Sequence, residues 1–321
     1  MANELLWTTQ SAYLTSGFLN KKFQKVAQPL MRFRQFCNVK EAFGKHKGES
    51  VNWLKVSNAS AYGGTIAETA TIPETTLPLD WGTLTVNEYG MAIPFSFKIE
   101  ALSEFDIEEL INGALMDDCR KVIDGTCERE FNKTPLRYCG IGAATGTFYT
   151  DSAATGTNTI ALNTFHIDEM VEYLKALNVP GYGNLEGDYC FIGSPKCLKG
   201  IKAALTGIYQ YTELGLRNIM AGEIGRYNGV RFIEDNFACS YVYSPAGTAT
   251  AISWTKGFSS PGYMFGSPTV REAVVVPEEL RAKIPTDYGR SHGIAWYGLF
   301  GFAIEWDEAA HARILKWDSA A

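Results

Sequence analysis

A single long amphipathic helix constrains this chain more than any other feature. Apolar side chains recur at spacings of three and four residues over 25 positions, with no break in the pattern. The sequence Ser103-Glu104-Phe105-Asp106 precedes the pattern and is a variant of the capping box. We therefore predict a helix over residues 104–133, which at 1.5 Å per residue is roughly 40 Å long. The apolar positions are Ile107, Leu110, Ile111, Ala114, Leu115, Cys119, Val122, Ile123, Cys127 and Phe131.

Two predicted strands precede this helix, at residues 50–57 and 81–99. In the second strand the alternation of apolar residues changes phase at Asn87-Glu88, which predicts a bulge where the strand changes the surface that it packs on. Pro94 lacks a backbone N–H, so it is expected at a sheet edge or at an irregular position.

The segment between the two strands, NASAYGGTIAETATIPETTLPLD, is unusually long for a loop in a compact domain. Loops of this length are either functional or disordered. Its 23 residues include only three charged ones, which is too few for a typical disordered segment. We infer that it packs on another chain.

The rest of the chain alternates helices and strands. We predict a helix at 165–177 with Thr164 as its cap, a strand at 188–192, and a helix after Ser194-Pro195. Asn228-Gly229 is the strongest short signal for a β-hairpin, here at 222–237. Further strands are predicted at 250–256, 270–276, 294–306 and 311–317, and residues 139–285 are expected to form one α/β lobe. The fold class is α+β.

Charge is unevenly distributed along the chain. The net charge is −6, whereas domains dedicated to nucleic-acid binding are usually basic. Residues 1–50 nevertheless carry eight Lys and Arg against three acids, and residues 51–130 carry five against fourteen. A basic arm and an acidic middle can pair within a chain or between copies, or form two solvated faces.

Motifs for catalysis or metal binding are mostly missing from the sequence. The four histidines are far apart, and Cys190 and Cys197 do not have a zinc-site spacing. The acids Glu104, Asp106, Glu108 and Glu109 are explained better by the start of a helix than by a metal site. We predict no catalytic residue, cofactor or metal; a Cys139–His292 pair assembled by the fold stays an alternative. The seven cysteines are expected to be reduced, as in a cytoplasm, and the N-terminus lacks the basic region of a signal peptide.

The order of these elements resembles the Hong Kong-97-type fold of tailed-phage major capsid proteins. Residues 222–234, GEIGRYNGVRFIE, resemble the G-E-x-G-x-x-x-G-V-R stretch of the coliphage N-four type of these proteins. Thr71-Ile72-Pro73-Glu74 resembles the I-P-E step in the extended loop of that group.

The resemblance implies a domain organisation. Residues 1–49 would be an N-terminal arm, and 50–99 the extended loop with a peripheral-domain strand. Residues 100–149 would be the peripheral domain with its spine helix, 150–285 the axial domain, and 286–321 the closing strands of the peripheral domain.

The resemblance also implies self-assembly. Copies of the chain would form hexamers and pentamers of an icosahedral shell that encloses double-stranded DNA without sequence-specific binding. Further partners would be scaffolding, portal and decoration proteins, with no membrane. The protein would be located in the virion after assembly in the host cytoplasm, and it would not be an enzyme. Expected contacts between subunits involve Phe18, Lys21, Lys22, Phe23, Tyr62, Ile66, Ile72, Pro73, Leu77, Arg226, Arg231 and Glu234.

Two alternatives stay open from sequence. An encapsulin, which is a bacterial nanocompartment shell, has the same fold and differs in its cargo. A cytoplasmic α/β enzyme that uses Cys139 or Cys197 belongs to another class. For each expected contact residue, packing within its own chain is the alternative.

Overall fold

The computed structural model describes most of the chain from residue 31 onward. The described residues are 31–41, 48–57, 64–66, 68–69, 71–72, 74–151, 160–209, 223–236, 241–243, 249–251 and 261–317. Among the expected contact residues, those of the arm (Phe18, Lys21, Lys22 and Phe23) and two of the loop (Tyr62 and Pro73) lie outside them.

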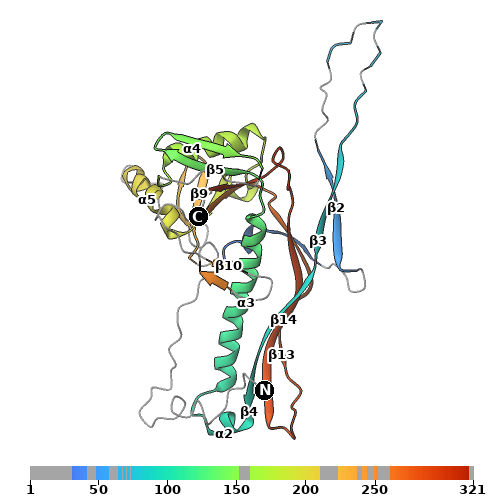
Figure 1. Ribbon diagram of the computed structural model, residues 1–321, viewed down its shortest axis with the longest axis vertical. Helices are drawn as coiled ribbons and strands as arrows, with labels where there is room; N and C mark the ends of the chain where they lie inside the picture. The colour runs from blue at the N-terminus through green and yellow to red at the C-terminus, as the bar shows by residue number, and fades with distance from the viewer. Residues whose placement is uncertain are drawn as a thin grey trace.

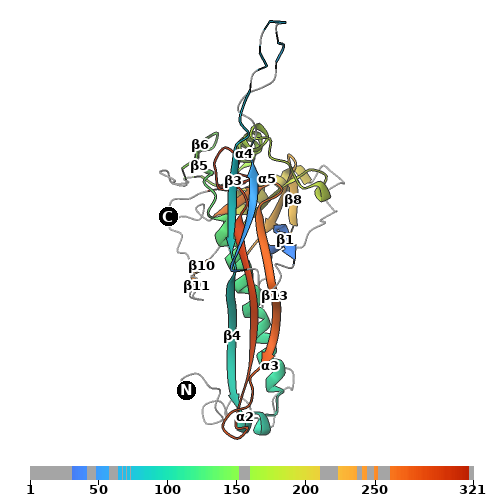
Figure 2. The same cartoon turned by 90° about the vertical axis from the view of Figure 1, so that its right-hand side faces the viewer.

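The predicted spine helix is α3, Ile107–Phe131, and it runs beside a long sheet (Figures 1 and 2). The sheet has the order β1-β13-β14-β4, formed by Asn38–Glu41, Val270–Ala282, Ser291–Ile304 and Asn87–Ser96. The helix begins three residues later than predicted, because Asp106 is its N-cap and its side chain accepts from the Glu109 N–H. Ser103 instead accepts from the Phe105 N–H in a local turn.

The predicted strand 81–99 is divided into three elements. β3, Leu79–Thr85, pairs with β2, Ser50–Val56, whereas β4 pairs with β14. The break at Val86 confirms a change of packing surface next to the predicted slip at Asn87-Glu88. Pro94 lies in β4 at the sheet edge, as predicted. The strand prediction for residues 97–99 is wrong, because Phe97–Leu102 form helix α2 and bury Ile99.

A second sheet of seven strands forms the α/β lobe. Its order is β6-β5-β15-β12-β7-β9-β8. Helices α4, Thr164–Ala176, and α5, Pro195–Tyr209, belong to this lobe (Figure 1). The cap of α4 is Asn163 rather than the predicted Thr164, because the Asn163 side chain accepts from the His166 N–H. The strands are β5 Arg137–Gly142, β6 Thr145–Tyr149, β7 Tyr189–Gly193, β8 Glu223–Tyr227, β9 Val230–Glu234, β12 Gly262–Phe265 and β15 Ile314–Trp317.

The sheets divide the chain differently from the predicted domains. β13 was expected in the lobe but lies in the long sheet, and β15 was expected beside β14 but pairs with β12 and β5. Residues 137–149 form the β5–β6 hairpin of the lobe. The shorter elements are η1 Arg34–Phe36, η2 Gly183–Leu185, β10 Tyr241–Tyr243 and β11 Ala249–Ala251.

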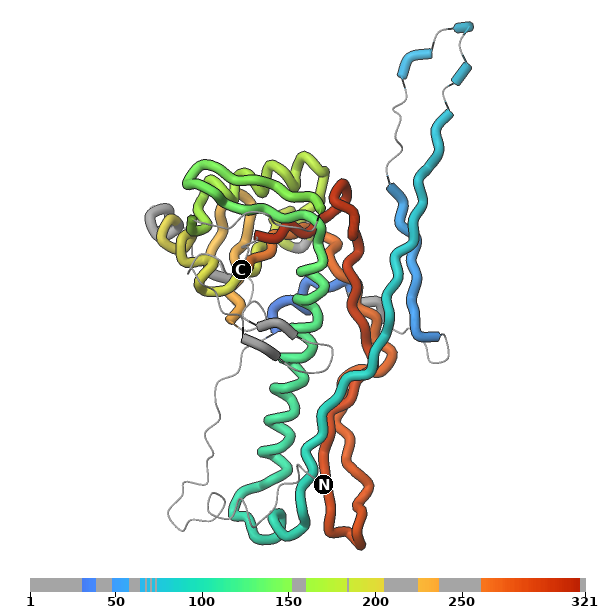
Figure 3. Tube along the Cα trace, in the orientation of Figure 1, coloured from blue at the N-terminus to red at the C-terminus, as the bar shows by residue number. Residues whose placement is uncertain are grey.

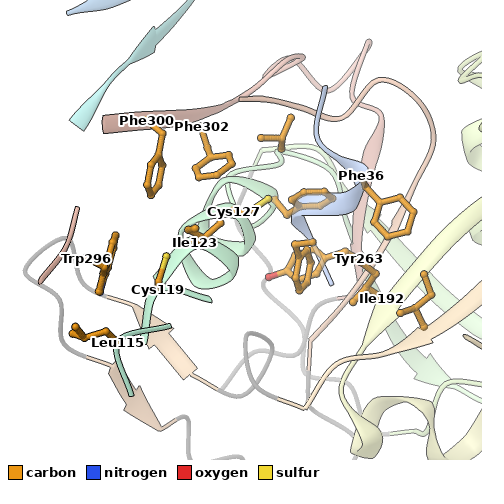
Figure 4. Close-up of a cluster of buried hydrophobic side chains, with 14 of the residues drawn as sticks. Phe36, Leu115, Cys119, Ile123, Cys127, Ile192, Tyr263, Trp296, Phe300 and Phe302 are labelled. Atoms are coloured by element: carbon orange, nitrogen blue, oxygen red, sulfur yellow. The ribbon is translucent and has the colours of Figure 1, made fainter. Parts of the chain in front are cut away.

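One continuous apolar core joins α3 to both sheets. On the helix it contains a buried row at four-residue spacing, and it extends through Trp296 and Phe300 of β14 to Ile192 of β7 (Figure 4). A second cluster fills the lobe around Trp317 and Phe191. Seven of the ten predicted stripe positions form this buried row, namely Ile107, Ile111, Leu115, Cys119, Ile123, Cys127 and Phe131. Leu110 and Val122 are partly buried against it, whereas Ala114 is exposed, contrary to the prediction.

Candidate interaction surfaces

The β2–β3 hairpin projects away from the body of the protein, and the described residues between its strands extend still farther (Figures 1 and 3). Side chains alternate strictly between its two faces. Val51, Trp53 and Leu84 are buried on one face, where they pack with Val86 and Ala273. This buried face attaches the hairpin to β13 of the long sheet.

Trp53 is the main anchor of the hairpin. Its indole ring covers Gly82 of the paired strand so closely that a Cβ atom there would lie 2.1 Å from the ring. The guanidinium of Arg271, which belongs to β13 of the long sheet, lies 5.0 Å from the centroid of the Trp53 ring in cation–π geometry. The buried Lys55 adds an ion pair, because its Nζ lies 2.5 Å from Asp307 Oδ1.

The opposite face of the hairpin is apolar and exposed. Leu54 is paired with Trp81, and Val56 with Leu79. Their side chains are 49%, 66%, 48% and 57% exposed, in that order. Because four large apolar side chains on one small surface are unusual for a monomer, this face is a candidate interface. We call these four residues the hairpin face. Sequence reasoning did not select them, although apolar residues occur on both faces of the 50–57 strand in the sequence.

The loop beyond the hairpin presents further apolar side chains. Of the residues expected there, Ile66 is 47%, Ile72 73% and Leu77 56% exposed. They therefore add little to the core of their own chain, which agrees with a contact role but does not test it.

Residues 31–41 are part of the folded body and not of an extended arm as expected. Phe33 and Phe36 are buried in the main core, and β1 pairs in parallel with β13. The Asp124 carboxylate of α3 accepts the backbone N–H groups of Arg32, Phe33 and Arg34 at 3.0, 2.8 and 3.4 Å. We call residues 32–37 the arm root, because they follow directly on the first thirty residues of the chain.

The 223–234 hairpin has the predicted turn, with positive φ at Asn228 and Gly229. Its charged residues pair within the chain. The Arg231 side chain is buried and its Nε lies 2.9 Å from Asp188 Oδ2, so the structure gives this residue a partner within its own chain. Arg226 binds Glu186 and Asp188, and Glu234 accepts from Lys202 at 2.6 Å.

The far end of the long sheet carries a second exposed apolar group, which sequence reasoning missed. Ile284 and Tyr288 in the β13–β14 connection are 84% and 105% exposed, and Phe97 of α2 is 55% exposed. Asp287 and Tyr288 both have φ near +53°, a conformation that L-residues rarely adopt. The Asp-Tyr-Gly sequence at 287–289 was the available signal for this turn.

The described residues offer little for catalysis. No group of three or more His, Cys, Asp or Glu side chains that could hold a metal is found among them. Cys139 lies in β5 of the lobe and His292 in β14 of the long sheet, so the fold places the proposed pair in different sheets. Cys197 is fully buried, and burial raises the pKa of its thiol, which disfavours a thiolate nucleophile. Within the described chain, no helix combines the length and apolar character needed to span a bilayer.

Comparison with solved structures identifies the fold. The chain is similar to a capsid chain of cyanophage P-SCSP1u, with 11% identity and a TM-score of 0.67, over 97% of this chain and 94% of the other. A head chain of Helicobacter pylori bacteriophage KHP40 matches with 11% identity and a TM-score of 0.65, over 98% of this chain and 97% of the other. A capsid chain of cyanophage Pam1 matches with 13% identity and a TM-score of 0.62, over the full length of both chains.

The predicted α+β fold of the Hong Kong-97 type is thereby confirmed. No protein-family profile and no curated protein sequence matches the chain. The likeness to the N-four group therefore stays a prediction.

Proposed function

We propose that this protein is a viral major capsid protein whose copies self-assemble, as hexamers and pentamers, into an icosahedral shell around double-stranded DNA. The hairpin face is the observation that carries the proposal. Its four exposed apolar residues lie on a fold that the chain shares with phage capsid chains. A neighbouring copy that covered this face would remove its apolar area from water.

The hairpin face suits a shell because of where it lies. It lies at the end of the β2–β3 ribbon that is nearest to the loop, and Trp53 and Lys55 on the opposite, buried face hold this ribbon to the body. A patch of one copy that meets a different patch of the next forms a heterologous contact, which closes into rings. We place Ile66, Ile72 and Leu77 in the same contact, together with Tyr62 and Pro73.

The experiment compares the wild-type chain with the double variant Leu54→Ser, Trp81→Ser. Electron microscopy and sedimentation are expected to show closed shells for the wild type and unassembled folded chains for the variant. Met116→Ser is the matched control, because Met116 is 46% exposed but lies on α3. It is expected to assemble normally.

Two outcomes contradict the proposal. If the wild-type chain forms no shell under any assembly condition, the capsid function is wrong. If the double variant forms shells as readily as the wild type, the hairpin face is not a subunit contact. Circular dichroism and thermal unfolding of the variant show whether the chain stays folded.

Other parts of the proposal depend on charge. The net charge of −6 disfavours tight binding of the enclosed DNA, because strong binding to phosphates depends on clustered Lys and Arg. We propose that Phe18, Lys21, Lys22 and Phe23 contact acidic segments of neighbouring subunits. Arg226 retains a 48% exposed side chain, so it and Glu234 can also contact a neighbour at a rim.

We also propose scaffolding, portal and decoration proteins as partners, a location in the virion, and assembly in the host cytoplasm. The neighbours named above are phage capsid chains, which supports a phage shell over an encapsulin. Purified particles distinguish the two, since a phage shell would contain DNA and an encapsulin would contain a cargo protein.

A further inference from the structure

Two cysteines meet where the arm root crosses the spine helix. Cys37 Sγ lies 3.0 Å from Cys127 Sγ, although 90 positions separate them in the sequence. A disulfide bond is about 2.05 Å long, so an approach of about 1 Å would bring the two sulfur atoms to bonding distance. Cys127 is fully buried, whereas Cys37 is partly exposed.

We propose that Cys37 and Cys127 form an intrachain disulfide when the folded protein meets a disulfide oxidant, and that this bond locks the arm root to α3. The inference concerns the single chain and does not require the shell. It departs from the expectation that all seven cysteines stay reduced.

The surrounding contacts hold both thiols in place before any bond forms. Asp124, one turn before Cys127 on α3, accepts three backbone N–H groups of the arm root. The Phe33 ring packs edge-on against Phe131 at 5.2 Å. Beyond the arm root, β1 pairs with β13. Because the backbone on both sides of Cys37 is already ordered, little further entropy is lost when the bond closes.

The exposure of the two thiols sets the order of the chemical steps. Cys37 is the accessible sulfur, so its thiolate attacks the oxidant, for example oxidised glutathione, and releases one glutathione thiol. Cys127 then loses its proton and attacks the Cys37 sulfur, which forms the protein disulfide and releases the second glutathione. One glutathione disulfide is consumed and two thiols are produced.

The second step is expected to be slow at neutral pH. Burial raises the pKa of the Cys127 thiol well above its ordinary value, and the neighbouring Cys37 raises it further. Fewer Cys127 thiolates are therefore available, so closure speeds up as pH rises.

The bond would have a mechanical effect on the protein. It closes a loop of about 90 residues that includes the β2–β3 hairpin, and closing a long loop stabilises mainly by restricting the unfolded chain. If the proposed capsid function holds, the bond would form after the chain leaves the reducing cytoplasm, because disulfides persist in oxidising surroundings.

The test uses the full-length unassembled chain, incubated with oxidised glutathione, then alkylated and digested with trypsin. Cleavage after Arg34, Lys40, Lys121 and Arg129 gives the peptides QFCNVK and VIDGTCER, each with one cysteine. The expected product is these two peptides joined by a bond that dithiothreitol breaks. The oxidised chain is also expected to unfold several degrees higher than the reduced chain.

Variants separate this pair from the other cysteines. Cys37→Ser is expected to lose the linked peptide and the thermal shift. Cys119→Ala is the control, because Cys119 also lies on α3 but is eight residues, about 12 Å, from Cys127. It is expected to keep both.

The mass spectrum of the wild-type chain decides the matter even if a variant fails to fold. The proposal is overturned if both peptides carry only the alkylating group, or if Cys37 carries glutathione and Cys127 stays free. None of these results depends on shell formation, so failure of this inference leaves the proposed function untouched.

Discussion

At the scale of single residues, two buried carboxyl groups on α3 have strongly raised pKa values. Asp124 and Glu128 lie one turn apart and are 3% and 8% exposed. Burial is the main cause that raises the pKa of each, nearby Asp235 adds to it, and the net value for each is about 7. The arm-root N–H groups lower the pKa of Asp124 in part, and Tyr263 and Lys316 do the same for Glu128. Asp124 therefore connects the attachment of the arm root to pH.

The direction of the pH effect follows from proton binding. The folded protein holds the Asp124 proton more tightly than the unfolded chain does, since the ordinary pKa is 3.8. This tighter proton binding by Asp124 increases the free energy of unfolding, and the increase is fully present below about pH 4. It is lost as pH rises to about 7, at up to roughly 1.4 kcal/mol per pH unit.

We predict that Asp124→Asn makes the free energy of unfolding less dependent on pH between about 4 and 7. The amide oxygen can still accept the arm-root N–H groups, but it has no proton to lose. Urea titrations of the unassembled chain at several pH values measure the slope. Asp124→Ala is the comparison, because it removes the acceptor as well and is expected to cost about 1–3 kcal/mol at all pH values. An unchanged slope in Asp124→Asn would contradict the pKa assignment.

At the scale of elements, the β2–β3 hairpin depends on one close approach. Trp53 packs directly over Gly82, and nothing larger than hydrogen fits between them. The same indole ring also interacts with the Arg271 guanidinium of the long sheet. Trp53 and the Lys55 ion pair therefore both hold the hairpin to the body of the protein.

We predict that Gly82→Ala detaches the hairpin from the long sheet without unfolding α3. The new methyl group would displace the Trp53 ring, and the apolar packing of Val51 and Leu84 would be lost with it. Hydrogen exchange is expected to show lost protection in β2 and β3 and unchanged protection in α3. Gly64→Ala is the control, because a Cβ there meets no atom within 4 Å. Equal protection in both variants would show that Trp53 is not the anchor.

At the scale of the whole molecule, the described part of the loop between β2 and β3 lies outside the core. Its described apolar residues Ile66, Ile72 and Leu77 are all exposed. The main core instead joins α3, the long sheet and the lobe into one body.

We predict that deletion of residues 60–78 leaves a folded monomer that cannot form shells. Residues 57–59 would then connect β2 to β3, whose pairing ends at Val56 and Leu79. The described residues of this segment are all exposed, so we expect the thermal unfolding temperature to change by only a few degrees. Sedimentation reports assembly and circular dichroism reports folding. Unfolding of the deleted chain would show that the loop belongs to its own domain.

Local patterns in the sequence were sufficient for the separate elements. The apolar spacing predicted α3, the Asn-Gly pair predicted the β8–β9 turn, and the phase slip predicted the break between β3 and β4. Each of these signals acts within a few residues, where backbone geometry and periodicity are decided. The order of the elements was then enough to predict the Hong Kong-97-type fold.

Only the tertiary structure decided which elements share a sheet and which charges are paired. β13 and β15 exchanged their expected sheets, Arg231 proved buried beside Asp188, and Cys37 met Cys127 across 90 positions. The hairpin face was also hidden from sequence, because Leu54 and Trp81 look the same as core residues until the body covers only one side of the strands. Such contacts join residues that are distant in the chain, so they depend on how whole surfaces pack and not on any local pattern.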